Sequence, residues 1–264
     1  MVYGRQDGVP RFECKEYAEK GKDYVVLIPI INEGERIIKE LKRAYKNNIA
    51  GYADIVVCDG GSTDGCIEES TFRKLRVNTL LVKQDIGKQG AQLRMGIWWA
   101  LRRGYKGIIT IDGNNKDSIE DVPRFIEKLK EGFDLVQGSR FIKGGKAINT
   151  PVIRRVSVRL IHAPIISLTA HQRFTDTTNA YRAYSAAYLQ DVRVKPLRDI
   201  FMTYELLAYL SVRATQLGYA ACEIPVTRAY PKTGRIPTKI SFFKGSSELI
   251  KILFKNALGV YNPN

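Results

Sequence analysis

The sequence predicts an α/β fold with a mostly parallel central sheet flanked by helices on both faces. Two observations support this prediction. Apolar runs typical of buried strands recur along the first half of the chain, at 24–30, 53–59, 79–84, 107–112 and 133–139. Segments with apolar residues at helical spacing separate most of them, and strands that alternate with helices form parallel sheets covered on both sides.

The helices between these strands each have a pattern of their own. The helix expected over 33–47 has its apolar residues at helical spacing, and the helix expected over 87–104 ends on a glycine. In the helix expected over 118–132, Ser118 and Asp121 have the spacing of a capping box.

The regular alternation stops after about residue 140. The sequence then predicts a basic loop and helix, a short extended segment, a helix, a strand, and a basic loop with an amphipathic helix, over 140–160, 174–185, 201–218, 219–231 and 232–261. No repeat or low-complexity linker interrupts the chain. We therefore expect a single domain over 1–264, with a ligand-binding half at about 20–140 and a less regular half at about 140–264.

Composition limits the classes of function. The chain has 264 residues, 44% hydrophobic and 26% charged, which is typical of a globular protein. Its formal charge of +15 predicts attraction to nucleic acid, an anionic membrane surface or phosphorylated small molecules. The four cysteines form no CxxC pair, which favours free thiols, and two histidines exclude an HExxH site or a His-rich metal cage.

Hydropathy indicates no segment that enters a membrane. The first residues lack the apolar core of a signal peptide, and no run of 18 apolar residues occurs. We expect a cytoplasmic protein, peripheral at the inner face of the cytoplasmic membrane, because the cationic helix within 232–261 suits an anionic surface. Packing of that helix into the core, through Leu249, Ile252 and Leu253, is the alternative.

Two acid-containing turns follow strands of the predicted sheet. The first acidic bend is "DGGSTDG" (59–65) and the second is "DGNNKD" (112–117). Because ligands of such sheets bind beyond the carboxyl ends of the strands, the two bends should share one rim. Asp112 supplies a carboxylate and Asn114 an amide oxygen for Mg²⁺ or Mn²⁺, while Gly113 lets the backbone turn. An ordinary turn also explains "DGN".

The same rim has the groups needed to hold a nucleotide-diphosphate sugar. Asp59 could accept a hydrogen bond from a base N–H or a ribose hydroxyl, and Gly61 permits close approach of a ligand. Lys88 and Arg94 lie at or near a helix start, where charge and helix dipole both favour phosphate.

Several motifs in the same order resemble one known family. They are "PIINEGE", "DGGSTDG", "GKQGAQLRMG", "DGNNKDSIE", "GSRF", "FTDTTNAYRAY", and "GYAACEIPVTR" ahead of "KTGRIPTK". Together they cover nearly the whole chain. The chain resembles the family 2 glycosyltransferases of GT-A fold, in the branch of dolichol- and polyprenyl-phosphate sugar synthases.

This resemblance implies roles for particular residues. The nucleotide would contact Pro29, Asn32, Glu33 and Asp59, and the metal and diphosphate would contact Asp112 and Asn114. The donor or lipid phosphates would contact basic residues, namely Arg140, Arg154, Arg155, Lys232, Arg235 and Lys239.

The chain departs from the family pattern at the second acidic bend. Asn114 stands where the family has a second acid, and Asn115 and Lys116 stand where Leu and Gln are frequent. One carboxylate fewer should weaken metal binding, and we hypothesise that Lys116 takes over part of the electrostatic role of the metal.

The implied reaction is inverting transfer of a sugar from a UDP- or GDP-sugar to an acceptor, in cell-surface glycan biosynthesis. An undecaprenyl or dolichyl phosphate is already anionic and needs only cations to hold it. A saccharide hydroxyl of a lipopolysaccharide, capsule or other glycan needs a general base. Candidate catalytic residues are Asp112 and Arg140, with Asp176, Asp199 and Glu205 as bases for a hydroxyl acceptor. The number of Arg and Lys residues in the second half favours the lipid phosphate.

Other classes of protein fit less well. The first strand is not followed by GxGxxG, no GxxxxGK[ST] occurs, and the glycine-rich loop of nucleotidyltransferases is missing. No zinc spacing or aromatic RNA-binding motif accompanies the positive charge, so we expect no nucleic-acid partner. A nucleotidyltransferase and a non-catalytic relative remain distant alternatives.

Overall fold

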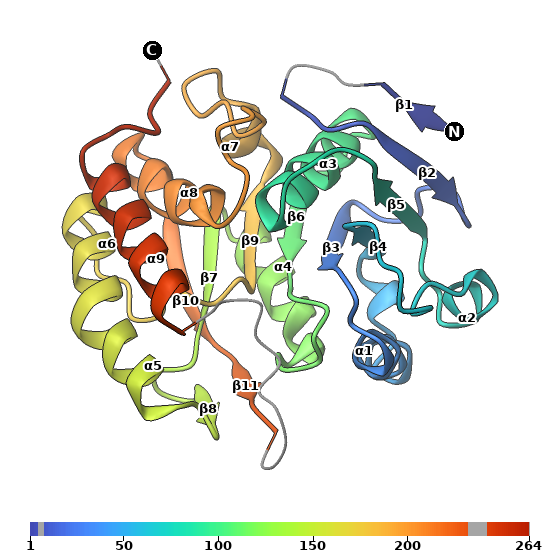
Figure 1. The fold of residues 1–264 in the computed structure, drawn as a ribbon, viewed down its shortest axis with the longest axis horizontal. Coiled ribbons are helices and arrows are strands. Elements are labelled where there is room, and N and C mark those ends of the chain that lie inside the picture. The colour runs from blue at the N-terminus through green and yellow to red at the C-terminus, as the bar shows by residue number, and fades with distance from the viewer. Residues whose placement is uncertain (5–7, 232–241, 264) are drawn as a thin grey trace.

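The computed structural model describes residues 1–4, 8–231 and 242–263, with side chains from residue 248 onward in the last range (Figure 1). A nine-stranded sheet forms the centre of the described chain. In spatial order its strands are β1 (Val2–Tyr3), β2 (Phe12–Glu16), β5 (Thr79–Lys83), β4 (Asp54–Asp59), β3 (Tyr24–Ile30), β6 (Gly107–Thr110), β9 (Arg182–Ser185), β7 (Leu135–Ser139) and β10 (Ala221–Pro225).

The sheet is mostly parallel, as predicted. Strands β5, β4, β3 and β6 are parallel neighbours, and β10 is parallel to β7. Strand β9 lies antiparallel between β6 and β7, and β2 lies antiparallel beside β5. Because β9 and β10 come from beyond residue 140, one sheet joins the regular first half of the chain to the less regular second half.

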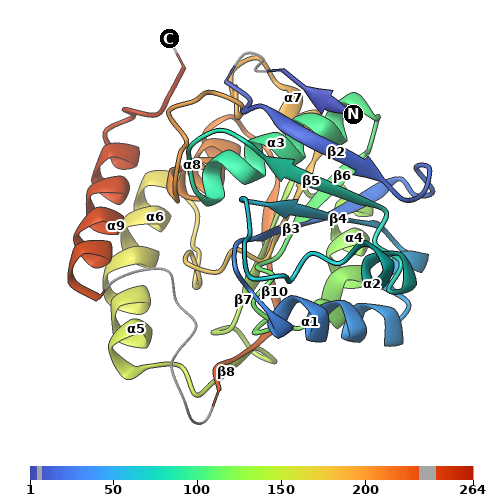
Figure 2. The same ribbon diagram turned by 45° about the vertical axis from the view of Figure 1, so that its right-hand side comes forward.

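Helices cover both faces of this sheet, which confirms the predicted fold class (Figures 1 and 2). One face packs against α1 (Glu35–Lys46), α2 (Glu69–Lys74) and α4 (Val122–Lys130), around a hydrophobic cluster that includes Ile37, Phe72 and Phe125. The other face packs against α3 (Gln89–Arg102), α6 (Ala163–Ala170), α8 (Glu205–Gln216) and α9 (Phe242–Ala257). The remaining helical segments are the 3₁₀ turns Ile49–Gly51 and Ile119–Asp121, α5 (Val152–Ser157), the π-helical segment Val158–His162, and α7 (Ala186–Gln190).

The last predicted strand is divided into two. It forms β10 and then β11 (Thr227–Ala229), and β11 leaves the large sheet to pair in parallel with β8 (Lys146–Ile148). The extended segment expected over 174–185 is a strand only at β9. Strands β1 and β2 and helix α2 were not expected, because each is short and lacks a clear hydrophobic period.

The capping box expected at Ser118 and Asp121 is wrong. The hydroxyl of Ser118 donates to the carboxylate of Asp121 and accepts a hydrogen bond from the backbone N–H of Thr227 at 3.0 Å, so it caps no N–H of α4. A 3₁₀ turn precedes α4, and Ser118 instead joins this turn to the start of β11. The prediction failed because a later strand, distant in sequence, competes for the hydroxyl.

The C-terminal helix packs into the core. Ile252 and Leu253 of α9 are buried in the same cluster as α3 and α8, which confirms the alternative of core packing for its apolar stripe. No described helix has the length and apolar character needed to cross a membrane. The four cysteines are free, as expected. Lys232, Arg235 and Lys239 fall outside the described residues.

Candidate active site

The two acidic bends lie on either side of the carboxyl end of β3. The backbone N–H of Gly60 donates to the carbonyl of Ile30 at 2.8 Å, and that of Gly113 approaches the carbonyl of Pro29 at 3.4 Å. They share one rim because β4 and β6 are the two parallel neighbours of β3. The loop after β3 also contacts the first bend, since the Asp64 carboxylate accepts from the backbone N–H of Gly34 at 2.7 Å.

The first turns of α3 tie this rim together. The Gln92 amide donates to the carbonyls of Ile30 at 2.6 Å and Cys58 at 2.8 Å, which join the ends of β3 and β4. One turn earlier, the Gln89 amide donates to Asp112 Oδ1 at 2.8 Å. Sequence reasoning nominated neither glutamine, although both lie in the quoted "GKQGAQLRMG".

Gly113 is required by close packing. A Cβ atom at this position would lie 2.4 Å from Ile30 Cγ2 and 3.0 Å from Ile28 Cγ2, both on β3. The bend therefore lies directly against β3. This contact fixes the positions of Asp112 and Asn114, the residues before and after Gly113.

Asp59 is used inside its own turn. Its carboxylate is 0% exposed and accepts hydrogen bonds from the backbone N–H groups of Gly61 at 2.8 Å and Ser62 at 2.9 Å, and from the Ser62 hydroxyl. Gly61 has φ +95°, a left-handed conformation that glycine adopts without strain. Asp59 therefore holds the shape of the bend, and its contact with a nucleotide stays a prediction.

The other predicted donor residues have different surroundings. Pro29 is buried within β3. Asn32 accepts from the backbone N–H of Thr63 at 2.8 Å, and Glu33 is paired with Arg36 at 2.8 Å, so both residues contribute to the loops of the rim.

Lys88 and Arg94, expected together at a phosphate, are separated. Lys88 is exposed at the start of α3. Arg94 is buried, with its guanidinium against the carbonyl of Gly8 and the sulfur of Met202. The second turn of α3 faces these two loops, so Arg94 joins them to the helix, and its contact with phosphate stays a prediction.

Asp112 is the partly open carboxylate of the rim. Its side chain is 20% exposed, and its Oδ2 lies 3.1 Å from Arg228 Nη2 and 3.3 Å from the Asn114 amide nitrogen. Burial raises the pKa of Asp112, but the positive charges of Arg228 and Lys116 outweigh this effect and hold it below its usual value. Asp112 is therefore ionised at neutral pH.

Arg228 was not nominated from the sequence. Its guanidinium lies between the carboxylates of Asp112 and Asp117, and although burial lowers its pKa, these two carboxylates raise it overall. Strand β11 brings it there, since the backbone N–H of Ala229 donates to the carbonyl of Lys116 at 2.8 Å. An arginine just after the last buried strand, in "IPVTRAY", was the available signal.

Three cations surround the ring of Tyr230. Lys116 Nζ lies 4.9 Å from the ring centroid, Arg228 lies 5.9 Å from it, and Arg154 donates to the Tyr230 hydroxyl at 2.7 Å. We call Lys116, Arg154, Arg228 and Tyr230 the cationic cluster. Burial lowers the pKa of Lys116 to about 8, with Arg228 contributing, and the three cations outweigh burial to lower the pKa of Tyr230.

Arg140 and Asp176, both expected to be catalytic, are paired with each other. Arg140 Nε lies 2.6 Å from Asp176 Oδ2, Arg140 Nη2 lies 2.8 Å from Oδ1, and the two side chains are 2% and 0% exposed. Such a buried bidentate pair leaves no open carboxylate or guanidinium. The pair joins the end of β7 to the segment before β9, and the roles predicted for Asp176 as a base and for Arg140 at a phosphate stay predictions.

Two further nominated residues, Glu205 and Arg155, have different surroundings. Glu205 begins α8, and its carboxylate accepts from the backbone N–H of Thr203 at 2.6 Å and from the Thr203 hydroxyl at 2.7 Å. Arg155, unlike Arg154 beside it, is exposed. Tyr204 lies near both Asp112 and Glu205, whose negative charges add to burial in raising its pKa.

The donor set at Asp112 fits a hard divalent cation that phosphates also coordinate. It consists of the Asp112 carboxylate and the amide oxygen of Asn114. In this structure the amide nitrogen of Asn114 faces Asp112 and the oxygen accepts from the backbone N–H of Lys116 at 3.3 Å, so the amide would have to turn over to bring its oxygen to an ion beside Asp112. Mg²⁺ is often held by only one or two carboxylates, with substrate phosphates completing its shell. Within the described ranges, no group of three or more His, Cys, Asp or Glu side chains could hold a metal by itself.

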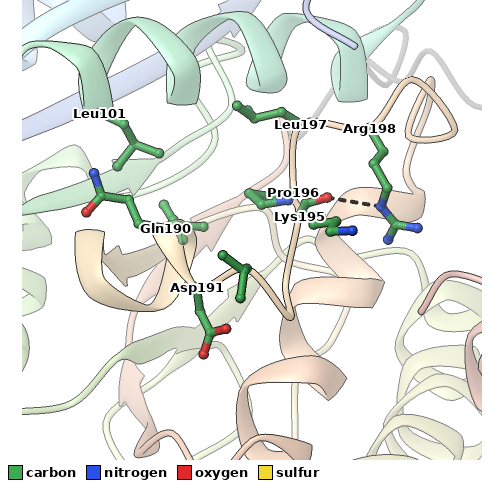
Figure 3. Close-up of a pocket in the computed structure, with 9 residues that line it drawn as sticks. Leu101, Gln190, Asp191, Lys195, Pro196, Leu197 and Arg198 are labelled. Carbon is green, nitrogen blue, oxygen red and sulfur yellow. Dashed lines mark hydrogen bonds between the residues drawn. The ribbon is translucent and has the colours of Figure 1, made fainter. Parts of the chain in front are cut away.

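A pocket elsewhere in the molecule has none of these residues. It lies between Leu101, near the end of α3, the last two residues of α7, and the segment 191–198 that follows α7 (Figure 3). Helix α7 follows β9, whose last residue Ser185 pairs with Gly107 at the start of β6. The pocket is therefore near the amino end of β6, whereas Asp112 follows the carboxyl end of the same strand.

Comparison with known proteins identifies the family. The chain is 30% identical to an undecaprenyl-phosphate mannosyltransferase of Micrococcus luteus over 207 residues, which cover 77% of this chain and 82% of that protein. It belongs to the family 2 glycosyltransferases. More narrowly, this glycosyltransferase falls in the dolichol- and polyprenyl-phosphate sugar synthase branch, as the motifs predicted. It is also 27% identical to a polyprenol monophosphomannose synthase of Mycolicibacterium smegmatis over 77% of this chain and 76% of that protein.

Solved structures confirm the GT-A fold of the glycosyltransferase. Glucosyl-3-phosphoglycerate synthase of Mycobacterium tuberculosis, crystallised with Mn²⁺, UDP and phosphoglyceric acid, superposes with a TM-score of 0.62 at 16% identity. The similarity covers 89% of this chain and 78% of that chain. No protein-family model matches the sequence.

Proposed function

We propose that this glycosyltransferase transfers a sugar from a UDP- or GDP-sugar to a polyprenyl phosphate, with inversion at the anomeric carbon. Residues 20–140 bind the donor, and residues 140–264 bind the acceptor. The enzyme acts while peripherally attached to the inner face of the cytoplasmic membrane, in the synthesis of cell-surface glycans.

The cationic cluster beside Asp112 is the observation that carries this proposal. Lys116, Arg154 and Arg228 bring three positive charges to one ring, whereas two carboxylates, Asp112 and Asp117, face Arg228. Positive charge therefore exceeds negative charge at a rim where parallel sheets bind ligands. The site suits two phosphate groups, one leaving with the nucleotide and one attacking from the acceptor.

The surroundings of the candidate bases favour an anionic acceptor over a saccharide hydroxyl. A hydroxyl needs a base within hydrogen-bond reach. Asp176 is locked to Arg140, and Glu205 is engaged with Thr203. A phosphate monoester needs no proton removed near neutral pH, and cations such as Arg154 are sufficient to hold it.

Asp112 and Asn114 would hold Mg²⁺ or Mn²⁺ together with the donor diphosphate. When bound, such an ion neutralises charge on the leaving group. The Mn²⁺ and UDP bound to the M. tuberculosis synthase support this assignment. Lys116 and Arg228 add charge from the protein itself, close to Asn114, which stands where the family has a second acid.

The residues of the chain then act by position and charge. Gln89 and Arg228 fix the orientation of Asp112, and the first acidic bend, braced by Asp59, leaves backbone N–H groups near the nucleotide. Lys116 stabilises the diphosphate as its bond to the sugar breaks. Arg154 orients the acceptor phosphate for attack on the opposite face of the anomeric carbon, which inverts its configuration.

The test is sugar transfer with a radiolabelled donor and undecaprenyl phosphate. UDP- and GDP-sugars are supplied separately, each with Mg²⁺, Mn²⁺ or a chelator. We expect label in a lipid product that is extracted into organic solvent, in the opposite anomeric configuration from the donor. Label that enters only an added oligosaccharide would contradict the proposed acceptor. Asp112→Asn is the inactive control.

A further inference from the structure

A second cavity of ligand size lies away from the acidic bends. It is the pocket between α3 and the end of α7 with the segment that follows, and its volume is about 580 Å³ (Figure 3). Sites that bind small molecules have volumes of this order. Its apolar wall is formed by Leu101, Leu189, Val192, Pro196 and Leu197. We call this cavity the α3 pocket.

The charged residues of the α3 pocket leave it positive. Its one lining carboxylate, Asp191, is paired with Arg193 at 2.6 Å. Of the two lining cations, Arg198 donates to backbone carbonyls, including that of Lys195 at 3.1 Å, and Lys195 forms no ion pair with any described residue. Asp199 is exposed and does not line the pocket. Positive charge beside an apolar wall suits an organic anion with an apolar body.

The turn that carries Lys195 has a strained backbone. Lys195 has φ +42°, in the left-handed region that few residues other than glycine and asparagine adopt. The hydrogen bond from Arg198 Nε to the Lys195 carbonyl closes this turn (Figure 3). Strained residues cluster at sites that bind ligands, where the surrounding structure keeps them in place. Strain and positive charge thus coincide at one wall of the α3 pocket.

The segment that lines the α3 pocket continues to the first turn of α3. The backbone N–H of Lys88 donates to the carbonyl of Met202 at 2.9 Å. A Cβ atom at Gly90 would lie 2.6 Å from the carbonyl oxygen of Phe201 and 2.9 Å from that of Thr203. The start of the helix therefore lies directly on segment 197–203, and a shift of the segment moves the helix start with it.

The same turn of α3 positions the carboxylate of the active site. Gln89 donates to Asp112 Oδ1 at 2.8 Å. Tyr204, next after the segment, lies close enough to Asp112 for this negative charge to add to burial in raising the pKa of Tyr204. Along the helix axis, about 18 Å separate Gln89 from Leu101 at the α3 pocket, so the two sites do not overlap.

We propose that the α3 pocket is a second ligand site of this glycosyltransferase, for a small organic anion with an apolar body, and that its occupant alters donor binding through segment 197–203. The apolar wall holds the body of the ligand, and Lys195 and Arg198 hold its anionic group. The inference goes beyond the proposed function and does not depend on the acceptor.

The first experiment measures binding of a fluorescent anion, anilinonaphthalene sulfonate (ANS), and of its uncharged analogue N-phenylnaphthylamine to the full chain. We expect ANS to bind at one site and more tightly than the uncharged probe. Lys195→Glu should bind ANS at least about fivefold more weakly, since repulsion replaces an attraction, and should bind the uncharged probe as wild type does. Leu101→Gln, which makes the wall polar, should weaken the binding of both probes.

The matched control for Lys195→Glu is Lys74→Glu. It makes the same change of charge at an exposed residue, the last of α2, and should bind ANS as wild type does. Thermal denaturation checks that each variant is folded.

The second experiment measures coupling to the donor site. ANS is titrated at increasing concentrations of UDP or GDP, and each nucleotide is titrated with and without ANS. The affinity for ANS should change by a factor that levels off, about 5-fold to 150-fold, and ANS should change the affinity for the nucleotide by the same factor. Lys195→Glu should bind the nucleotide as wild type does and respond less to ANS.

A third experiment identifies the anionic group of the ligand. Octanoate, octyl phosphate and octanol compete with ANS for the wild-type protein. Displacement by octanoate alone indicates a carboxylate ligand, and displacement by octyl phosphate alone indicates a phosphate ligand. Octanol should displace ANS less than either anion does. Equal displacement by all three would contradict an anion site.

Three further results would overturn the α3 pocket as a coupled site. They are ANS binding that Lys195→Glu leaves unchanged, nucleotide binding that ANS leaves unchanged, and an affinity for ANS that falls without limit as nucleotide is added. The last result would place ANS in the active site. Failure of UDP and GDP to bind at all would contradict the proposed function, and the ANS measurements with Lys195→Glu would then decide the pocket alone.

Discussion

The two acidic bends begin alike and are used differently. Asp59 is the last residue of β4 and Asp112 follows β6, the two parallel neighbours of β3, and each precedes a glycine. Asp59 is closed, because its oxygens accept hydrogen bonds from its own turn. Asp112 is partly open, and its main partners, Gln89 and Arg228, come from α3 and β11. A carboxylate at the end of a strand is thus available for chemistry when its partners come from distant segments and not from the backbone of its own turn.

Of the substitutions that distinguish the two bends, one at Asp112 should have the largest effect on turnover. Asp112→Asn keeps the shape of the side chain and removes the charge that orients Arg228 and would hold a cation. Turnover should fall by about 10²–10³-fold, as when one preorganised group that stabilises the transition state is removed. Steady-state kinetics measure this fall, and near-UV circular dichroism checks that the fold is retained. Wild-type turnover in the variant would place the chemistry elsewhere.

Lys116 should have the next largest effect. Lys116→Met retains the length of the side chain but removes a charge-assisted contact worth about 1.5–3 kcal/mol, which corresponds to a fall of roughly 10-fold to 100-fold in turnover. The matched control is Lys83→Met, because Lys83 is also buried and lies near the first bend, against the carbonyl of Asp85. If the two variants turn over equally, the cationic cluster has no special part in catalysis.

Asp59 should affect stability more than turnover. Asp59→Ala leaves the backbone N–H groups of Gly61 and Ser62 without their acceptor and should lower the free energy of unfolding by about 1–3 kcal/mol. Urea denaturation measures this loss, and Asp59→Asn, which retains one acceptor oxygen, should recover part of it. A loss of turnover at Asp59 as large as that at Asp112, with stability unchanged, would remove the distinction between the bends.

Substitution of Glu40 should have the smallest effect, a change in stability that depends on pH. It is buried under the second bend, where its carboxylate accepts from the backbone N–H of Asn115 at 2.7 Å. Burial raises its pKa well above the usual value, with Asp117 and Asp112 adding to the rise, so stability falls as pH rises from the unfolded value toward the folded one. Glu40→Gln should match or exceed wild-type stability at neutral pH.

Denaturation at about pH 5 and about pH 8 tests this prediction, because Glu40→Gln should lose less stability between them than wild type does. A larger loss in the variant would mean that the ionised carboxylate stabilises the bend. Glu40→Leu, which leaves the N–H of Asn115 unpaired, is expected to be destabilising at both pH values.

The sequence was sufficient for the sheet, its parallel strands and the shared rim, since these follow from hydrophobic runs and the placement of helices between them. It also singled out Asp112, which matches a known motif, and Lys116, which departs from that motif; their roles stay predictions. It was not sufficient for Arg228, because only the pairing of β11 with β8 and the second bend brings that arginine to Asp112. It did not predict that Arg140 and Asp176 pair with each other or that Arg94 is buried, because a charged residue's partner is set by tertiary contacts that no local pattern shows.

The central claim is that the donor diphosphate binds beside Asp112 and the cationic cluster, with the first acidic bend forming only the wall of the nucleotide site. A crystal structure with the intact nucleotide sugar and a divalent cation tests it most directly. We predict phosphate oxygens in contact with Lys116 and the cation at Asp112, and an Asp59 carboxylate still bonded to its own turn. Phosphates bound away from Asp112 and Lys116, or an Asp59 turned out to ligate the cation, would contradict it.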